Sequence, residues 1–163
     1  MAENDPPAPK PADPLNLPPQ NIEAEESLLS AILVDNTALL EVVEVLAVQD
    51  FYRTAHQKIF AAISDLFNRG EPIDLVTLAN GLKEKGHLEG VGGAAYLARL
   101  VDTVPMAVNA QHYARIVHDK AVLRRLIEKA NAITKRCFQE QGGTDEIIDF
   151  AEASIFEVTE KKA

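Results

Sequence analysis

Residues 107–140 read AVNAQHYARIVHDKAVLRRLIEKANAITKRCFQE and contain neither glycine nor proline. Because these two residues are the strongest helix breakers, the stretch predicts one helix of roughly 34 residues, about 50 Å long. Gly142 and Gly143 interrupt the pattern, after which Thr144 or Asp145 can cap a final helix. Two helices joined by so short a turn lie antiparallel, so this part of the chain predicts a long helical hairpin.

The segment before the hairpin has the apolar spacing of several short helices. Predicted helices start at Asn21 and near Asn36 or Thr37, cover about 54–69, run from Asp74 to Lys85, and cover about 93–101. We expect the second of them to point Leu39, Leu40, Val43 and Leu46 inward, and Phe51 and Tyr52 to fill the core. No strand pattern is long enough to compete. The predicted fold class is all-α, a compact orthogonal bundle of short helices followed by a long antiparallel hairpin.

Prolines mark the first part of the chain. Residues 1–19 hold seven of the nine prolines, and proline lacks an amide donor and fixes φ. This predicts a disordered Pro-rich leader, with a ligand for a proline-binding module as the less favoured alternative. The predicted organisation is therefore the leader at 1–19, a globular helical head at 20–104 and the helical hairpin at 105–163.

The hairpin has more apolar surface than two helices can bury in each other. Its long helix carries a stripe of Ile116, Leu123, Leu126, Ile127, Ala130, Ile133 and Cys137, and its final helix carries Ile147, Ile148, Ala151, Ile155 and Val158. One interpretation is that the hairpin folds back on the bundle. The favoured one is that it packs against another copy of the chain or a partner.

The charge is unevenly spread. The net charge is −9, which argues against general polyanion binding, yet residues 106–140 carry seven bases and three acids. These bases are interleaved with apolar positions and few aromatics. We expect a solvated face that complements acidic neighbours, including the acidic final helix. Docking of an acidic partner and direct contact with DNA are the alternatives.

No catalytic pattern is present in the sequence. It has no GxxxxGK[ST] phosphate loop, the GVGG at 90–93 is typical of a tight connector, and the four histidines lack metal-ligand spacing. We expect the histidines to be partly exposed and Cys137, the single cysteine, to be a buried apolar residue. Without a secretory signal or a long apolar run, the chain is expected to be a cytoplasmic protein with no membrane contact, and no enzyme by itself.

Several stretches, taken in order, resemble the N-terminal domain of the bacterial replicative DNA helicases of the DnaB family. They are LPPQNIEAEESLLSAILVDN at 17–36, DFYRTAHQKIF at 50–60, EPIDLVTLANGLKEKGHLEGVGGAAYLARL at 71–100, VPMAVNAQHYARIV at 104–117 and EIIDFAEASIFEV at 146–158. Together they cover nearly all of the predicted ordered part, and several motifs in the same order are far more specific than any one of them.

The resemblance implies a function in DNA replication. In that family the hairpins pair into dimers, and three dimers form a collar on one side of a hexameric ring. The collar docks the C-terminal domain of primase and is the expected docking site of a helicase loader, while single-stranded DNA passes through the full ring. The motor is a separate RecA-like ATPase domain, so ATP and magnesium are expected there and no cofactor is expected in this chain. The alternative is a module that guides single-stranded DNA with its basic long helix.

The resemblance carries over no catalytic residue, so the predicted sites are contact surfaces. For self-association we predict the apolar hairpin residues Leu123, Leu126, Ile127, Ile133, Ile148, Ile155 and Phe156. For contact with primase we predict Tyr96, Arg115, Ile127, Ile133 and Ile148. The two sets overlap because a sequence does not tell which neighbour each apolar side chain faces.

Overall fold

The computed structural model describes residues 17–103 and 109–160, and every regular element within them is helical. In chain order the helices are α1 (Ile22–Val34), α2 (Ala38–Val42), the short 3-10 helix η2 (Val48–Asp50), α3 (Thr54–Asn68), α4 (Leu75–Glu84), α5 (Gly93–Asp102), α6 (Ala110–Gln139) and α7 (Thr144–Glu160). The predicted all-α fold class is confirmed. Residues 1–16 of the leader predicted at 1–19, and the expected start of the long helix at Ala107, lie outside the described residues.

Side-chain caps fix where the helices begin. Asn21 Oδ1 accepts a hydrogen bond from the amide of Ala24 at 2.9 Å, as the sequence predicts for the first helix. Asn109 caps α6 in the same way through the amide of His112 at 3.2 Å. Each cap satisfies an amide that has no partner within its helix, so the polar residue immediately before each apolar pattern sets the helix boundary.

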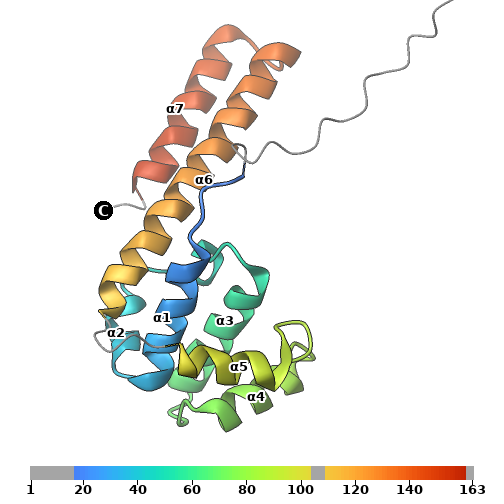
Figure 1. Ribbon diagram of the computed structural model, residues 1–163. Helices are drawn as coiled ribbons and strands as arrows, with labels where there is room; N and C mark the ends of the chain where they lie inside the picture. Colours follow the sequence, from blue (N-terminus) through green and yellow to red (C-terminus); the bar gives the residue numbers. More distant parts are fainter. Residues whose placement is uncertain (1–16, 104–108, 161–163) are drawn as a thin grey trace, which may run out of the picture.

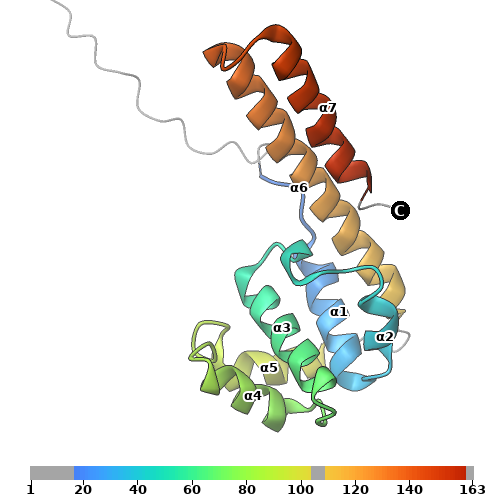
Figure 2. The same cartoon turned by 180° about the vertical axis from the view of Figure 1, so that it is seen from behind.

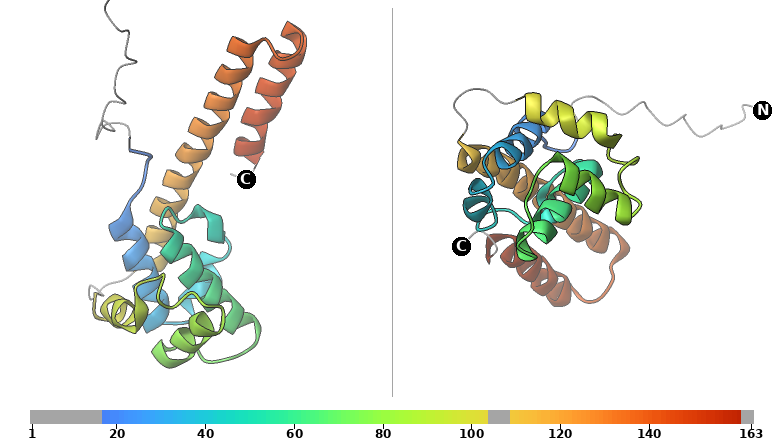
Figure 3. Two further views of the ribbon diagram at one scale, coloured as in Figure 1. Left: turned by 90° about the vertical axis from the view of Figure 1, so that its right-hand side faces the viewer. Right: turned by 90° about the horizontal axis from the view of Figure 1, so that it is seen from below.

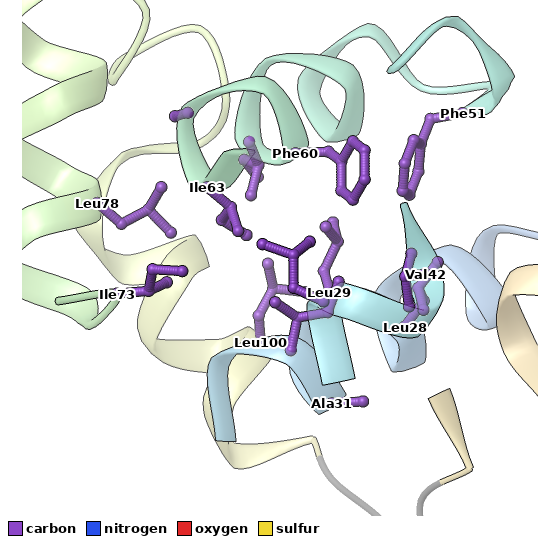
Figure 4. Packing of buried hydrophobic residues seen from close by; sticks show 14 of the residues in the cluster. Leu28, Leu29, Ala31, Val42, Phe51, Phe60, Ile63, Ile73, Leu78 and Leu100 are labelled. Carbon is purple, nitrogen blue, oxygen red and sulfur yellow. The ribbon is translucent and has the colours of Figure 1, made fainter. Parts of the chain in front are cut away.

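Helices α1 to α5 form the head, with α1 packed against α3 and α5 (Figures 1 and 2). The apolar spacing of α1 places Leu28, Leu29 and Ile32 in the core, where they are completely buried. Figure 4 shows Leu29 among side chains that arrive from α3, α4 and α5, including Ile63 and Leu78. The head is therefore held by one continuous apolar cluster.

The two halves of helix α6 pack against different parts of the protein. Its first half packs on α1 and α2 through small residues, with Ala110, Ala114, Val117 and Ala121 buried at helical spacing. Its second half leaves the head and pairs with α7, and the resulting hairpin projects from the head (Figures 1 and 3). The interpretation that the hairpin folds back on the bundle holds for the first half of α6 alone, because the second half of α6 packs with α7.

Three apolar side chains and one thiol are more exposed than predicted. Leu40 and Val43 are exposed, since α2 is only five residues long and buries Leu39 and Val42, each one position earlier. Tyr52 is also exposed, whereas its neighbour Phe51 is buried as predicted. Cys137, which the sequence predicts to be buried, is exposed, because α7 does not cover the end of the α6 stripe that contains it.

The cap of α4 gives a prediction about acid stability. Asp74 accepts the amide of Thr77 at 2.9 Å, and this hydrogen bond lowers the pKa of Asp74 below its usual value of 3.8. The carboxylate's contribution is present above the unfolded-state pKa and is lost as the pH falls through the lower folded-state pKa. Asp74→Asn, which keeps a capping oxygen, should therefore lose less thermal stability between neutral pH and about pH 3 than the parent chain does.

Thermal unfolding midpoints at the two pH values measure this difference. Asp102→Asn, at the end of α5, removes one acid without removing a cap and serves as the control. Equal losses in the parent chain and in Asp74→Asn would contradict the assignment.

Candidate interaction surfaces of the head and the hairpin

The hairpin presents an uncovered apolar face on α7. The side of α7 that meets α6 carries Ser154 and Val158, which are both buried. Ile148 and Ile155 lie two helical turns apart on a neighbouring side and are 49% and 40% exposed, while Phe156 is 63% exposed. No helix of the described chain covers these three side chains, so a face with the composition of a contact surface is left open to solvent.

The predicted contact residues of α6 differ in how deeply they are buried. Leu123 and Ile127, one turn apart, are exposed, whereas Leu126 and Ile133 are half-buried beside α7. The remaining two predicted contact residues lie elsewhere. Tyr96 is half-buried on α5 in the head, and Arg115 is exposed on the head-proximal part of α6. The structure thus distributes the predicted residues along the hairpin and over the head rather than in one cluster.

Two polar contacts hold α7 to α6. Lys129 Nζ lies 2.7 Å from Glu157 Oε2, and this hydrogen bond raises the pKa of Lys129. Nearer the turn, the Arg136 guanidinium lies 4.0 Å from the centre of the Phe150 ring, which is cation–π geometry. These two bases of the long helix are therefore engaged within the hairpin.

The junction between head and hairpin is organised by Asp50, a buried carboxylate at the end of η2. Its Oδ1 accepts a hydrogen bond from Arg125 Nη1 at 2.7 Å, and its Oδ2 accepts the amide of Ala47 at 2.9 Å. Its main-chain carbonyl accepts Arg124 Nη2 at 2.6 Å. Because two consecutive arginines of α6 bind one residue of the head, the direction in which the hairpin leaves the head is fixed.

Arg124 also holds the segment that precedes α1. Its Nη1 donates to the carbonyl of Pro19 at 2.7 Å, and its guanidinium lies 5.4 Å from the centre of the Tyr52 ring. Burial lowers the pKa of this guanidinium, which nevertheless keeps its charge at physiological pH. A groove of about 600 Å3 opens here, lined by Leu17, Pro18, Pro19, Tyr52, Arg124, Ile127, Glu128 and Asn131. The predicted contact residue Ile127 thus lies in a groove at the junction.

Removing the Arg124 side chain tests this junction. Arg124→Ala is expected to lower the free energy of unfolding by about 1.5–3 kcal/mol, because two carbonyl acceptors lose a charged donor. Arg115→Ala, an exposed arginine of the same helix, should change it by less than about 0.5 kcal/mol. Urea denaturation of both variants measures the two effects. Equal effects would show that the Arg124 contacts do not stabilise the junction.

A buried polar network, which sequence reasoning missed, connects three helices of the head. Glu25 on α1 accepts the amides of Tyr52 and Arg53 at 2.8 and 3.3 Å, and its Oε1 lies 2.8 Å from His56 Nδ1. His56 Nε2 lies 2.6 Å from the hydroxyl of Tyr96. Glu25 and His56 are almost completely buried, so the expectation that the histidines are partly exposed is wrong for His56.

A signal for this network exists in the sequence. Glu25 precedes Leu28, Leu29 and Ile32 by three, four and seven positions, so it shares the buried stripe of α1. A carboxylate in phase with an apolar stripe needs a buried partner. Tyr96 lies at the outer end of the network, where burial first and the Glu26 carboxylate second raise the pKa of its phenol. The hydroxyl therefore stays protonated and donates to Glu26.

The described residues offer neither a metal site nor a membrane-spanning helix. Within residues 17–103 and 109–160, no group of three or more His, Cys, Asp or Glu side chains is placed to hold a metal ion. None of the helices in these ranges is long and apolar enough to span a bilayer. The surfaces that the described residues do offer are the apolar hairpin face and the grooves of the head.

A helical head with a projecting hairpin and open apolar faces defines a protein-interaction module. The family model of the DnaB-like helicase N terminal domain matches residues 17–119, and the chain belongs to this family. Among curated relatives, the replicative DNA helicase DnaB of Geobacillus stearothermophilus is 46% identical over 146 residues, or 90% of this chain. The replicative DNA helicase DnaB of Mycobacterium leprae is 46% identical over 145 residues, or 88% of this chain. The matched region covers 32% of the first relative and 24% of the second.

Solved structures show the same fold. The N-terminal domain of DnaB helicase from Mycobacterium tuberculosis superposes with a TM-score of 0.81 at 44% identity, covering 86% of this chain and 99% of that one. A DnaB-like replicative helicase, studied for its interactions with primase, superposes with a TM-score of 0.69 at 23% identity. That match covers 86% of this chain and 31% of the other.

Proposed function

We propose that this chain acts as the N-terminal collar domain of a hexameric replicative DNA helicase, where it is an oligomerisation scaffold and a docking platform for primase and a helicase loader. The family membership supports the setting in DNA replication. The single observation that carries the proposal is the hairpin itself. It extends away from the head and leaves Ile148, Ile155 and Phe156 without a covering helix in the described chain.

Self-association is the first role that this geometry supports. Apolar side chains two turns apart on one side of α7 form a stripe that a second helix can cover. Leu123 and Ile127 provide a similar exposed pair on α6, and Leu126 and Ile133 lie half-buried beside them. A second hairpin packed against the first would bury these surfaces, which are costly to expose to water.

Docking of the primase C-terminal domain is the second role. The groove at the junction is bounded by an exposed aromatic ring, a prolyl segment and Ile127, a combination that suits an apolar side chain from a partner. Tyr96, Arg115, Ile133 and Ile148 remain proposed contacts of the same partner. The DnaB-like helicase whose structure was studied for its interactions with primase has this fold, which supports the choice of partner.

The remaining family functions are proposed for the whole protein. ATP and magnesium would bind a RecA-like ATPase domain, toward whose linker the hairpin at 105–163 leads, and unwinding would be carried out there. Single-stranded DNA would pass through the assembled ring. The bacterial origin of the relatives supports a cytoplasmic location.

Guiding single-stranded DNA with the long helix is the less favoured function for this chain. Of the bases on α6, Arg124, Arg125, Lys129 and Arg136 already contact protein groups, as described above. Few cations therefore remain for phosphates. A salt-dependent affinity for oligonucleotides, with the slope that several neutralised phosphates produce, would favour this alternative.

Light scattering over a series of protein concentrations tests the scaffold role. We expect the mass to rise from one copy to a dimer or a larger even-numbered assembly, since hairpins pair two by two. A mass of one copy at all concentrations up to about 1 mM, where even weak specific complexes form, would contradict self-association through the hairpin.

A further inference from the structure

A second pocket lies in the head between α3, η2 and the loop that follows α4. Its volume is about 200 Å3. Val48 and Ala61, both half-buried, supply its apolar surface, and the buried Ala62 and Leu82 lie behind them. Small-molecule and cofactor sites usually measure about 300–1,000 Å3. The size and the apolar lining therefore suit one large side chain better than a whole cofactor.

The polar part of the same pocket is basic. Lys58, Lys85 and His87 line it, together with Thr54 and Gln57, and no carboxylate is among the described residues of its wall. In the described part of the chain, neither lysine forms an ion pair with a carboxylate. Two unpaired ammonium groups beside one apolar pocket are notable in a chain whose net charge is −9.

Local backbone geometry builds this arrangement. On α3, Lys58 lies one turn from Ala61 and Ala62, so the charge and the apolar wall share one side of the helix. Helix α4 ends at Glu84 with Lys85 as its C-cap, and Gly86 has a φ of 72°, which turns the chain. The amide of His87 then donates to the carbonyl of Leu82 at 2.8 Å. The turn thereby fixes His87 beside Leu82. The side chain of Gln57 is already engaged, since its Nε2 donates to the carbonyl of Phe51 at 2.7 Å.

We propose that this pocket binds an acidic peptide segment of a partner protein, which inserts one apolar side chain against Val48 and Ala61 and places carboxylates beside Lys58 and Lys85. Charge complementarity selects this occupant. Single-stranded nucleic acid usually binds where several aromatic side chains offer platforms for successive bases, and among the described residues of this wall there is no Phe, Tyr or Trp and one His. The site is separate from the proposed primase groove, with which it shares no lining residue.

Fluorescence anisotropy with a labelled Asp-Asp-Phe-Asp-Asp peptide tests the proposal on the 163-residue chain. We expect saturable binding with a Kd below about 1 mM, which is in the range of weak single-motif contacts. The Asp-Asp-Ala-Asp-Asp and Lys-Lys-Phe-Lys-Lys peptides should each bind at least about tenfold more weakly, because one lacks the apolar anchor and the other the charges.

Matched variants locate the binding. Lys58→Glu and Lys85→Glu should each weaken it at least about tenfold, and Ala61→Leu, which fills the pocket without changing charge, should do the same. Lys83→Glu makes the same charge change on α4 outside the pocket and should change the affinity less than about twofold. Circular dichroism confirms that each variant is folded. Absence of binding at 1 mM peptide, equal effects of Lys83→Glu and Lys85→Glu, or equal affinity for the Phe and Ala peptides would overturn the proposal.

Discussion

Replacing Glu25 by alanine is expected to lower the free energy of unfolding by about 2–5 kcal/mol, because each of the two main-chain amides that it accepts would be left without an acceptor, at about 1–3 kcal/mol per group. The carboxylate is 1% exposed and accepts two main-chain amides from the segment that leads into α3, as well as contacting His56 Nδ1. Alanine would leave these donors buried without an acceptor. Since the donors come from a segment far along the chain from α1, the packing of α1 on α3 should loosen as well.

Urea denaturation at neutral pH measures the effect. Glu23→Ala, an exposed acid two positions earlier in the same helix, is the control and should cost less than about 1 kcal/mol. A Glu25→Ala variant within about 1 kcal/mol of the parent chain would show that water or a rearranged side chain replaces the carboxylate.

Ile155→Asp is expected to weaken self-association by more than about 30-fold, which corresponds to about 2 kcal/mol. Ile155 lies on the open apolar face of α7, so aspartate there would place a charge in the proposed contact between hairpins. The substitution should leave the fold intact, because the side chain is 40% exposed in the single chain. Analytical ultracentrifugation over a concentration series gives the dissociation constants.

The control introduces the same charge elsewhere on α7. Ala153→Asp changes an exposed alanine two positions earlier, which projects from a different side of the helix. We expect a change of less than about threefold for it. If both variants associate as tightly as the parent chain, the contact between copies does not use this face of α7.

The helices of the fold could be predicted because each is encoded locally. The caps at Asn21 and Asp74 and the glycines that end α3 and α4 are readable in sequence, and the long helix follows from its lack of breakers. Local signals of this kind do not fix how a helix is covered by its neighbours. Leu40 and Val43 are exposed because α2 is short, and Cys137 is exposed because α7 does not cover it. Both outcomes depend on tertiary packing and not on the local sequence.

The burial of Glu25 could be predicted from its place in an apolar stripe, but the partners of the buried polar groups could not, because they are distant in sequence. Glu25 meets His56 across 31 positions, and Arg125 meets Asp50 across 75. Sequence patterns predict Arg125, like the other bases of residues 106–140, on a solvated face and His56 as partly exposed. The structure instead uses them to join α1 to α3 and the hairpin to the head.

Calorimetric titration of the chain with the C-terminal domain of the primase from the same organism tests the central proposal most directly, with light scattering on the same samples. We predict saturable binding with a micromolar or tighter Kd, and a stoichiometry that identifies whether a dimer of this chain is the docking unit. No detectable heat at several temperatures, from samples that light scattering shows to be dimers or hexamers, would contradict the proposal. The assembly would then be present, and primase would not be the partner that it binds.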